Sequence, residues 1–507
     1  MFEATHPFLF FDYFRVPYQL APPRADRPDP PGASIDRFCG RLWKVPVEDG
    51  TRATLSWLVD DSHEIRKSGA VAGQYVLNGN PIFGHVVPDS VARQWLDGTG
   101  GWRPVESISN AAGRPVASVW QAADGSVFLP FDPGEVMRRF WSEAYGSIGQ
   151  ATLVAGIRSA LVKGYYTVRP VMPRPLQIAL RRIFTRVQRR SMFPRWPIED
   201  ALHDLYEWLF NRLAAFAGCP VPWLDLWPDG RAWALVLTHD VETSVGCRDL
   251  HLLRDVEREL GHTSSWNFVP LRYNVDDAIL DALRAEGCEI GVHGLLHDGR
   301  DLGSRRLFRK RLPKIREYAR RWDAVGFRAP ATQRVWQWMP RMGFDYDTSY
   351  HDTAPYEPTP GGCCSYLPYF NEGMVELPIT LPQDHTIFAI LQHPDETLWT
   401  QKAAHVRNRG GMVLVLTHPD YVGDPRLVEG YRRLLKGLES DPSVWRALPR
   451  EVSDWWRRRA GSRLEQTKTG WTIRGPAMPD GSVRFARTGE PALVADDAGP
   501  QWAGGES

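Results

Sequence analysis

The sequence has few cysteines, no long apolar run and almost no net charge. Its six cysteines lack C-x-x-C and zinc-ribbon spacing, so we interpret them as reduced thiols in a cytoplasmic protein. Because no uninterrupted apolar stretch reaches about 18 residues, no transmembrane helix is expected. The amino terminus has neither a basic segment nor an apolar run of signal-peptide length, which favours the same cytoplasmic location.

The formal net charge is +1, so no overall positive field would attract nucleic acid, and we expect no nucleic-acid partner. One segment departs from this balance, because residues 176–190 carry Arg181, Arg182, Arg186, Arg189 and Arg190. Such a segment is typical of a solvated helix face. The alternative is a basic helix for peripheral membrane contact or for an acidic glycan.

Length and patterning divide the chain into four segments. At 507 residues it is too long for one ordinary domain. Short apolar runs separated by Gly- and Asp-rich turns predict a mixed or β-rich domain at 1–130. Helical periodicity predicts a connecting region at 131–228. An α/β domain is expected at 229–450, and a carboxyl-terminal tail at 451–507.

Two local predictions concern the ends of the chain. The aromatic run within the first twenty residues, Phe-Leu-Phe-Phe-Asp-Tyr-Phe, is typical of a strand that packs into a core. In the tail, residues 471–473 and 483–485 are expected to form the two strands of a hairpin.

The segment 229–450 alternates short apolar strands with amphipathic helices, which is typical of parallel α/β structure. We expect strands at 234–237, 265–269, 289–292, 324–327, 375–377 and 412–416. Helices are expected at 249–260, 276–286 and 305–322. Roughly 210 residues with this alternation suit a slightly short or distorted (β/α) barrel.

Polar residues follow several of these strands, at the edge where α/β folds place their chemistry. His293 and His297 are four residues apart, so both imidazoles can face one metal ion. Asp240 and an acidic neighbour two residues later could supply a general base and a ligand. Arg328 could hold a carboxylate ionised, and His418 could act as a general acid. Any one of these residues could equally be a helix cap or a surface residue.

The order and spacing of these motifs resemble the polysaccharide deacetylase (NodB-homology, carbohydrate esterase family 4-like) superfamily over residues 233–425. The segments that carry the resemblance are Thr238-His-Asp-Val-Glu242, His293-Gly-Leu-Leu-His297, Arg328-Ala-Pro330, Asp345-Tyr-Asp-Thr-Ser-Tyr350 and Leu416-Thr-His418. The resemblance implies a distorted (β/α) barrel. It also implies that Asp240 is the base, held by Arg328, that His293 and His297 bind the metal, and that His418 is the acid.

The third metal ligand departs from the family pattern. The commonest family members carry a metal-binding aspartate directly after the base, and Val241 stands there in this sequence. Members with an Asp-x-Asp arrangement imply that Glu242 is the ligand instead, with Asp240 itself as the alternative. The ion is expected to be Zn²⁺, with Co²⁺, Ni²⁺ or Mn²⁺ as further candidates.

The resemblance therefore predicts a metal-dependent hydrolase that removes N-acetyl groups from an amino sugar in a glycan or glycan precursor. Trp336, Trp338 and Tyr350 could stack on a sugar ring, or could simply cover the barrel mouth. Two alternatives remain. One is a C–N hydrolase that acts on a non-sugar amide, and the other is a non-catalytic glycan-binding scaffold with a vestigial barrel.

Overall fold

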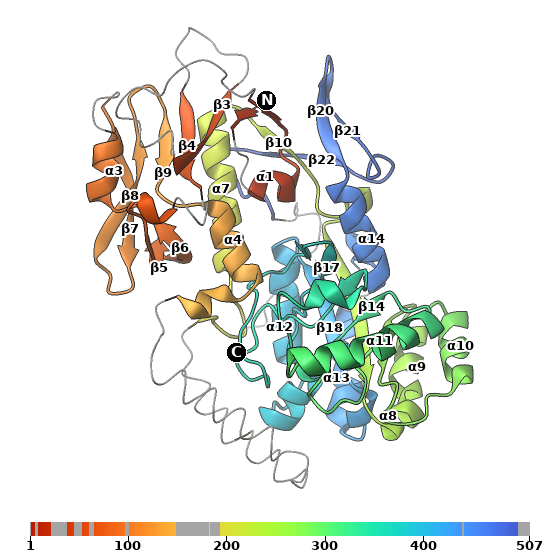
Figure 1. Ribbon diagram of the computed structural model, residues 1–507. Coiled ribbons are helices and arrows are strands. Elements are labelled where there is room, and N and C mark those ends of the chain that lie inside the picture. Colours follow the sequence, from red (N-terminus) through yellow and green to blue (C-terminus); the bar gives the residue numbers. More distant parts are fainter. Residues whose placement is uncertain are drawn as a thin grey trace, which may run out of the picture. The chain divides into compact units, whose positions relative to one another are not determined.

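The computed structural model describes residues 2–5, 9–21, 38–44, 53–59, 65–96, 101–148, 182, 193–438 and 441–494. These residues belong to two compact units (Figure 1). The first unit comprises Met1–Lys163, Asp200–Asp225 and Arg458–Ala492, and the second comprises Gly164–Glu199, Leu226–Arg457 and Leu493–Ser507. The chain therefore returns to its first unit after the second, whereas the sequence suggests a separate tail. Apart from Arg182, the basic segment 176–190 lies outside the described residues.

The first unit contains a nine-stranded sheet with strand order β2-β1-β3-β4-β9-β8-β7-β5-β6. Its strands are β1 (Phe2–Ala4), β2 (Tyr18–Leu20), β3 (Cys39–Lys44), β4 (Thr54–Leu58), β5 (Val71–Leu77), β6 (Asn80–Val86), β7 (Arg103–Asn110), β8 (Pro115–Gln121) and β9 (Val127–Leu129). Helices α1 (Leu9–Phe14), α3 (Asp89–Leu96), α4 (Pro133–Trp141) and α7 (Ala201–Ala217) belong to the same unit. Asn78 and Gly79, both with positive φ, form the two-residue turn between β5 and β6.

The aromatic run near the amino terminus is a helix, so the strand prediction is wrong there. Phe10 and Phe14 are one helical turn apart, and both rings lie 4.7 Å from the ring of Phe210 in α7. Aromatic residues favour strands only weakly, and packing on α7 decides the local structure here.

The carboxyl-terminal strands have other partners than predicted. Strand β21 (Gly470–Arg474) pairs with β20 (Arg463–Thr467), whereas β22 (Val483–Ala486) pairs with β10 (Val221–Leu224). The predicted hairpin between residues 471–473 and 483–485 is therefore wrong. A strand pairs with whatever edge its unit offers, and for β22 that edge is more than 250 residues earlier in the sequence.

Arg459, near the end of helix α14 (Pro449–Ala460), joins three parts of the first unit. Its buried guanidinium donates hydrogen bonds to the carbonyls of Tyr13 (2.6 Å), Leu224 (2.7 Å) and Asp225 (2.8 Å). Because these carbonyls come from two separate parts of the chain, one buried side chain holds both of them to the carboxyl-terminal segment.

The second unit has a nine-stranded sheet with order β16-β17-β15-β14-β13-β12-β11-β18, and β19 also pairs with β11. The strands are β11 (Trp233–Val241), β12 (Ser265–Phe268), β13 (Glu289–Val292), β14 (Gly326–Phe327), β15 (Tyr346–Asp347), β16 (Tyr369–Asn371), β17 (Met374–Glu376), β18 (Met412–Thr417) and β19 (Val444–Arg446). All pairs except β16–β17 are parallel. The predicted α/β class is confirmed, and each predicted strand is present.

Helices connect these parallel strands, and the three predicted at 249–260, 276–286 and 305–322 are among them. They are α8 (Ser244–Asp249), α9 (His251–Glu259), α10 (Asp277–Ala285), α11 (Arg305–Arg321), α12 (Thr397–Asn408) and α13 (Pro425–Leu438). Asp276 and Ser304 cap the first turns of α10 and α11 through hydrogen bonds from backbone N–H groups. Within the part of the chain that the structure describes, no helix is long and apolar enough to cross a lipid bilayer.

The segment after β17 hydrogen-bonds to strands on both sides. The Ile379 amide donates to the carbonyl of Tyr350, just beyond β15 (2.8 Å), and the Leu381 amide donates to the carbonyl of Leu414 in β18 (3.2 Å). This segment therefore links the β15 side of the sheet to β18. It brings the carboxyl ends of these strands around one site.

We expect Arg459→Ala to lower the free energy of unfolding by about 3 kcal/mol or more, because three buried carbonyls lose a charged donor. The neighbouring Arg458 forms a half-exposed ion pair with Asp480, so Arg458→Ala should cost less than about 1 kcal/mol. Urea denaturation followed by circular dichroism measures both values. Equal stability of the two variants would contradict the role given to Arg459.

Candidate metal centre

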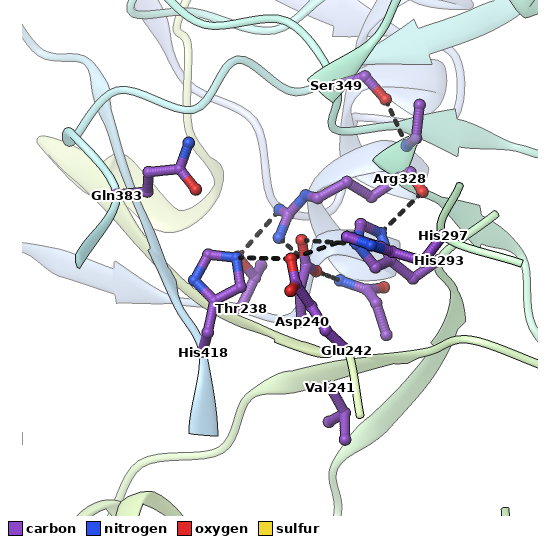
Figure 2. Close-up of polar contacts among 12 residues, drawn as sticks. Thr238, Asp240, Val241, Glu242, His293, His297, Arg328, Ser349, Gln383 and His418 are labelled. Atoms are coloured by element: carbon purple, nitrogen blue, oxygen red, sulfur yellow. Dashed lines mark hydrogen bonds and ion pairs between the residues drawn. The ribbon is translucent and has the colours of Figure 1, made fainter. Parts of the chain in front are cut away.

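The side chains at the end of strand β11 point alternately to two sides, and one of these sides faces the candidate metal centre. Successive residues of a strand point to opposite faces, so Asp240 and Glu242 share one side while His239 and Val241 share the other. On that other side, His239 hydrogen-bonds to Glu257 through Nε2 and to Thr417 through Nδ1, both at 2.7 Å. Figure 2 shows Val241 pointing away from the polar cluster. The acidic pair of a D-x-E sequence can therefore face one site.

Arg328 lies at the centre of the cluster and is fully buried. Its Nη1 donates to Oδ1 of Asp240 (3.0 Å) and its Nη2 to Oγ1 of Thr238 (2.9 Å). Its Nε donates to the carbonyl of Thr348 (3.0 Å). Burial raises the pKa of Asp240, but Arg328, the nearby histidines and the hydrogen bond from Asn267 together outweigh burial and hold that pKa below its ordinary value. Asp240 is therefore ionised at neutral pH.

Glu242, His293 and His297 come together as a group that could hold a metal ion, with one ligand atom from each lying within 4.8 Å of the others. Nε2 of His297 is 3.0 Å from Oε1 of Glu242. Nε2 of each histidine is buried and forms no hydrogen bond with a described residue. Two orphaned imidazole nitrogens beside a carboxylate are the nitrogen and oxygen donors that a zinc-like ion takes.

A hydrogen bond orients the ring of His293, and the backbone conformation of its loop places His297. His293 follows β13 directly, and its Nδ1 donates to the carbonyl of Arg328 (3.1 Å), which leaves Nε2 as the ligand atom. His297 has a positive φ of 53° in the loop that follows. Burial lowers the pKa of His293 to about 4, so this ring is neutral at pH 7, as a metal ligand must be.

Asp240 lies beside the metal group, and its hydrogen bonds are to residues outside that group. Its Oδ1 accepts from Arg328 and from Nδ2 of Asn267, both at 3.0 Å. Its Oδ2 is 3.6 Å from Nε2 of His293. Burial raises the pKa of Glu242, but His297 outweighs it and holds that pKa well below its ordinary value. The structure thus offers two ionised carboxylates, and it groups Glu242 with the histidines.

His418 faces the cluster from the opposite side, as Figure 2 shows. Its Nε2 is 3.9 Å from Oε1 of Glu242, and its Nδ1 hydrogen-bonds to Oδ1 of Asp384 at 2.6 Å. Burial lowers the pKa of His418, but Asp384, with smaller contributions from Glu242 and Asp240, raises it to a net value of about 10. The ring is therefore protonated at neutral pH.

Sequence reasoning missed Asp384. This fully buried carboxylate accepts from the His418 ring and also from the His418 backbone amide (2.7 Å). It follows the predicted strand at 375–377 by seven residues, beyond the segment that crosses to β18. The rule applied to the other strands, a polar residue close to a strand end, does not reach it, and only the fold shows its contact with His418.

Each of the three residues predicted to stack on a sugar packs against another aromatic side chain of the protein. Tyr350 is 2% exposed, and its ring centroid is 6.1 Å from that of Trp336. Trp336 also stacks on Tyr369 at 6.2 Å, and Trp338 stacks on Phe308 of α11 at 5.4 Å. The two tryptophans are partly exposed, and their role with a sugar stays a prediction.

The chain resembles solved structures of polysaccharide and peptidoglycan deacetylases. A Mycobacterium smegmatis protein described as a candidate polysaccharide deacetylase has 19% identity and a TM-score of 0.37, over 46% of this chain and 93% of its own. The PuuE allantoinase has 16% identity and a TM-score of 0.37, over 46% and 92% of the two chains. Peptidoglycan deacetylase PdaC from Bacillus subtilis has 11% identity and a TM-score of 0.31, over 45% and 92%. No family model and no curated protein matches the chain.

We expect the purified protein to bind about one divalent ion per chain, and His293→Ala and Glu242→Gln to lose it, because each removes one donor of the group. Elemental analysis by plasma mass spectrometry measures the metal content. His251→Ala, which changes an exposed histidine of α9, is the matched control and should retain the ion.

The same measurement decides the third ligand. If Glu242 binds the ion, Asp240→Asn retains it. Loss of metal from Asp240→Asn together with retention by Glu242→Gln would assign the third position to Asp240.

Proposed function

We propose that this chain is a metal-dependent hydrolase that removes N-acetyl groups from an amino sugar in a glycan or glycan precursor, on a distorted (β/α) barrel of the polysaccharide deacetylase type. The observation that carries the proposal is the arrangement around the metal group. A carboxylate held ionised by Arg328 lies on one side of it, and an imidazole held protonated by Asp384 lies on the other. Amide hydrolysis needs this combination of base and acid.

Glu242, His293 and His297 would hold the ion, and Zn²⁺ suits two imidazoles and a carboxylate, with Co²⁺, Ni²⁺ and Mn²⁺ as further candidates. Such an ion polarises an amide carbonyl and lowers the pKa of water. Three protein ligands would leave a position on the ion open to a substrate or water. His293 is buried and the other two side chains are partly buried, which strengthens the electrostatic interactions within the site.

Asp240 accepts the proton of the attacking water. Arg328 and Asn267 hold its Oδ1, so Oδ2 is the atom that faces the site and takes the proton. The ion pair with Arg328 does more than keep the carboxylate ionised. It also fixes the direction of Oδ2, which is the geometric requirement for a general base.

His418 donates a proton from Nε2 to the departing nitrogen. Asp384 binds Nδ1 and the backbone amide of the same residue, so both the tautomer and the orientation of the ring are set. An amine is a poor leaving group unless it is protonated, and a ring with a pKa of about 10 arrives at this step already carrying the proton.

We expect the protein to release acetate from N-acetylhexosamine oligomers or from lipid-linked N-acetylated sugars. Asp240→Asn should lower kcat by about 100-fold or more, because a positioned general base contributes on that order. Acetate is measured by a coupled enzymatic assay across the panel of sugars. The control Asp454→Asn changes an acid of α14 that is outside the proposed site.

The alternatives predict other results in the same assay. A hydrolase for non-sugar amides would leave every sugar intact and cleave a small amide such as a ureide. A vestigial scaffold would bind N-acetylated glycans without releasing acetate. Acetate release that survives Asp240→Asn would remove Asp240 from the role of base.

The pH dependence of kcat should follow the protonation of His418. Its protonated form is the active one, so activity is present below its pKa and is lost as the pH rises through about 10. Asp384→Asn removes the carboxylate that raises this pKa and leaves the burial that lowers it, so the high-pH limb should move to lower pH. Glu289→Gln, at another buried carboxylate of the same unit, should leave the limb in place. An unchanged limb in Asp384→Asn would contradict the assignment.

A further inference from the structure

The first two turns of α11 carry an exposed cluster of basic side chains, which we call the α11 basic patch: Arg305, Arg306, Arg309 and Lys310. Within the described ranges, none of these four forms an ion pair or a side-chain hydrogen bond. Most basic residues later in the helix are engaged, and exposed Arg320 is the exception among the described residues. Arg311 pairs with Asp298 (2.6 Å) and Lys314 with Glu317 (2.6 Å). The patch is thus the largest group of unpaired basic side chains among the described residues of α11.

The position of the patch is unfavourable for the helix itself. Ser304 caps the first turn, and that turn contains no acidic residue. The amino-terminal turn of a helix lies at the positive end of its dipole, so the two cations in that turn, Arg305 and Arg306, destabilise the helix. A surface that existed only to solubilise the helix would carry acidic residues at this end. The patch is better explained by an anionic partner.

The patch lies at the same edge of the unit as the candidate metal centre. Strands β13 and β14 are parallel neighbours, so the chain between them must run back from the carboxyl end of β13 to the amino end of β14, and α11 is the helix of this connection. The amino-terminal end of α11 is therefore at the carboxyl end of β13, where His293 and His297 follow the strand. Figure 1 shows α11 on the surface of this unit.

Two exposed leucines adjoin the metal centre at this edge. Leu271 is 43% exposed and Leu296 is 37% exposed. Their loops touch, because the Leu271 amide donates to the carbonyl of Leu295 (3.1 Å) and Nη1 of Arg272 lies 2.6 Å from Nδ1 of His297. Exposed apolar side chains add nothing to the recognition of a soluble polyanion, whereas they can enter the headgroup region of a lipid surface.

From these observations we propose that the edge around the metal centre docks on an anionic phospholipid surface. The α11 basic patch binds lipid phosphates, for which arginine has the matching fork of donors, and Leu271 and Leu296 enter the headgroup boundary. The proposal deepens the proposed function, on which it rests, because a docked site would meet its N-acetylated sugar on a lipid carrier. Charge complementarity together with the adjoining apolar pair favours a lipid surface over an acidic polymer.

The test is co-sedimentation of the full chain with vesicles. We expect binding to phosphatidylcholine vesicles that contain about one-third phosphatidylglycerol, and little binding to phosphatidylcholine alone. Arg309→Gln should weaken the partition constant about fivefold, since one basic residue near such a surface contributes about that factor. Arg320→Gln is the matched control, because it removes an exposed arginine three turns further along the same helix, and should change binding less than twofold.

Two further variants separate the contributions. The quadruple glutamine variant of the α11 basic patch should lose binding to anionic vesicles while its Tm stays equal or rises, which excludes unfolding as the cause. Leu271→Ser/Leu296→Ser should weaken the binding that persists at high salt. Equal binding of wild type and quadruple variant would overturn the proposal, and so would binding to dextran sulfate without binding to vesicles. Vesicle binding requires no turnover, so a failure of the proposed reaction is a separate result.

Discussion

The buried pair of Arg328 and Asp240 is the interaction on which the candidate site depends. A guanidinium with no solvent contact is tolerable only when its donors are satisfied, and here they reach Asp240, Thr238 and Thr348. The carbonyl of the same residue accepts from Nδ1 of His293. One residue at the end of β14 therefore orients both the Asp240 carboxylate and the His293 ring, and removal of its side chain would leave that buried carboxylate without its guanidinium partner.

The parts of this site that the sequence predicts are those that follow from strand geometry. Parallel strands bring their carboxyl ends to one edge, so Asp240, His293, Arg328 and His418 could be expected together although up to 178 residues separate Asp240 from His418. The two-residue period of β11 explains why Glu242, and not Val241, shares the side of Asp240. Six strands and three helices of this unit were predictable from their period, and two of those helices, α10 and α11, also have a side-chain cap.

The parts that the sequence does not predict depend on long-range packing. Asp384 lies on an irregular crossing segment, and only the folded chain places it against His418. The Phe10–Phe14 segment has an aromatic composition typical of strands, yet contacts with Phe210 make it helical. Strand β22 has an ordinary strand pattern that carries no information about its partner β10. In each case, the deciding contact is distant in sequence.

Local rules and the folded structure disagree most clearly in two places, and the disagreements have different meanings. At α1, the weak preference of aromatic residues for strands yields to a packed core, and stability is gained. At the start of α11, Arg305 and Arg306 lie at the positive end of the helix dipole without acidic partners among the described residues, and stability is lost. At α1, packing within the chain compensates for the weak local preference, so the conflict concerns folding alone. At α11, no described residue compensates for the cations, which is what a surface that binds an anionic partner would require.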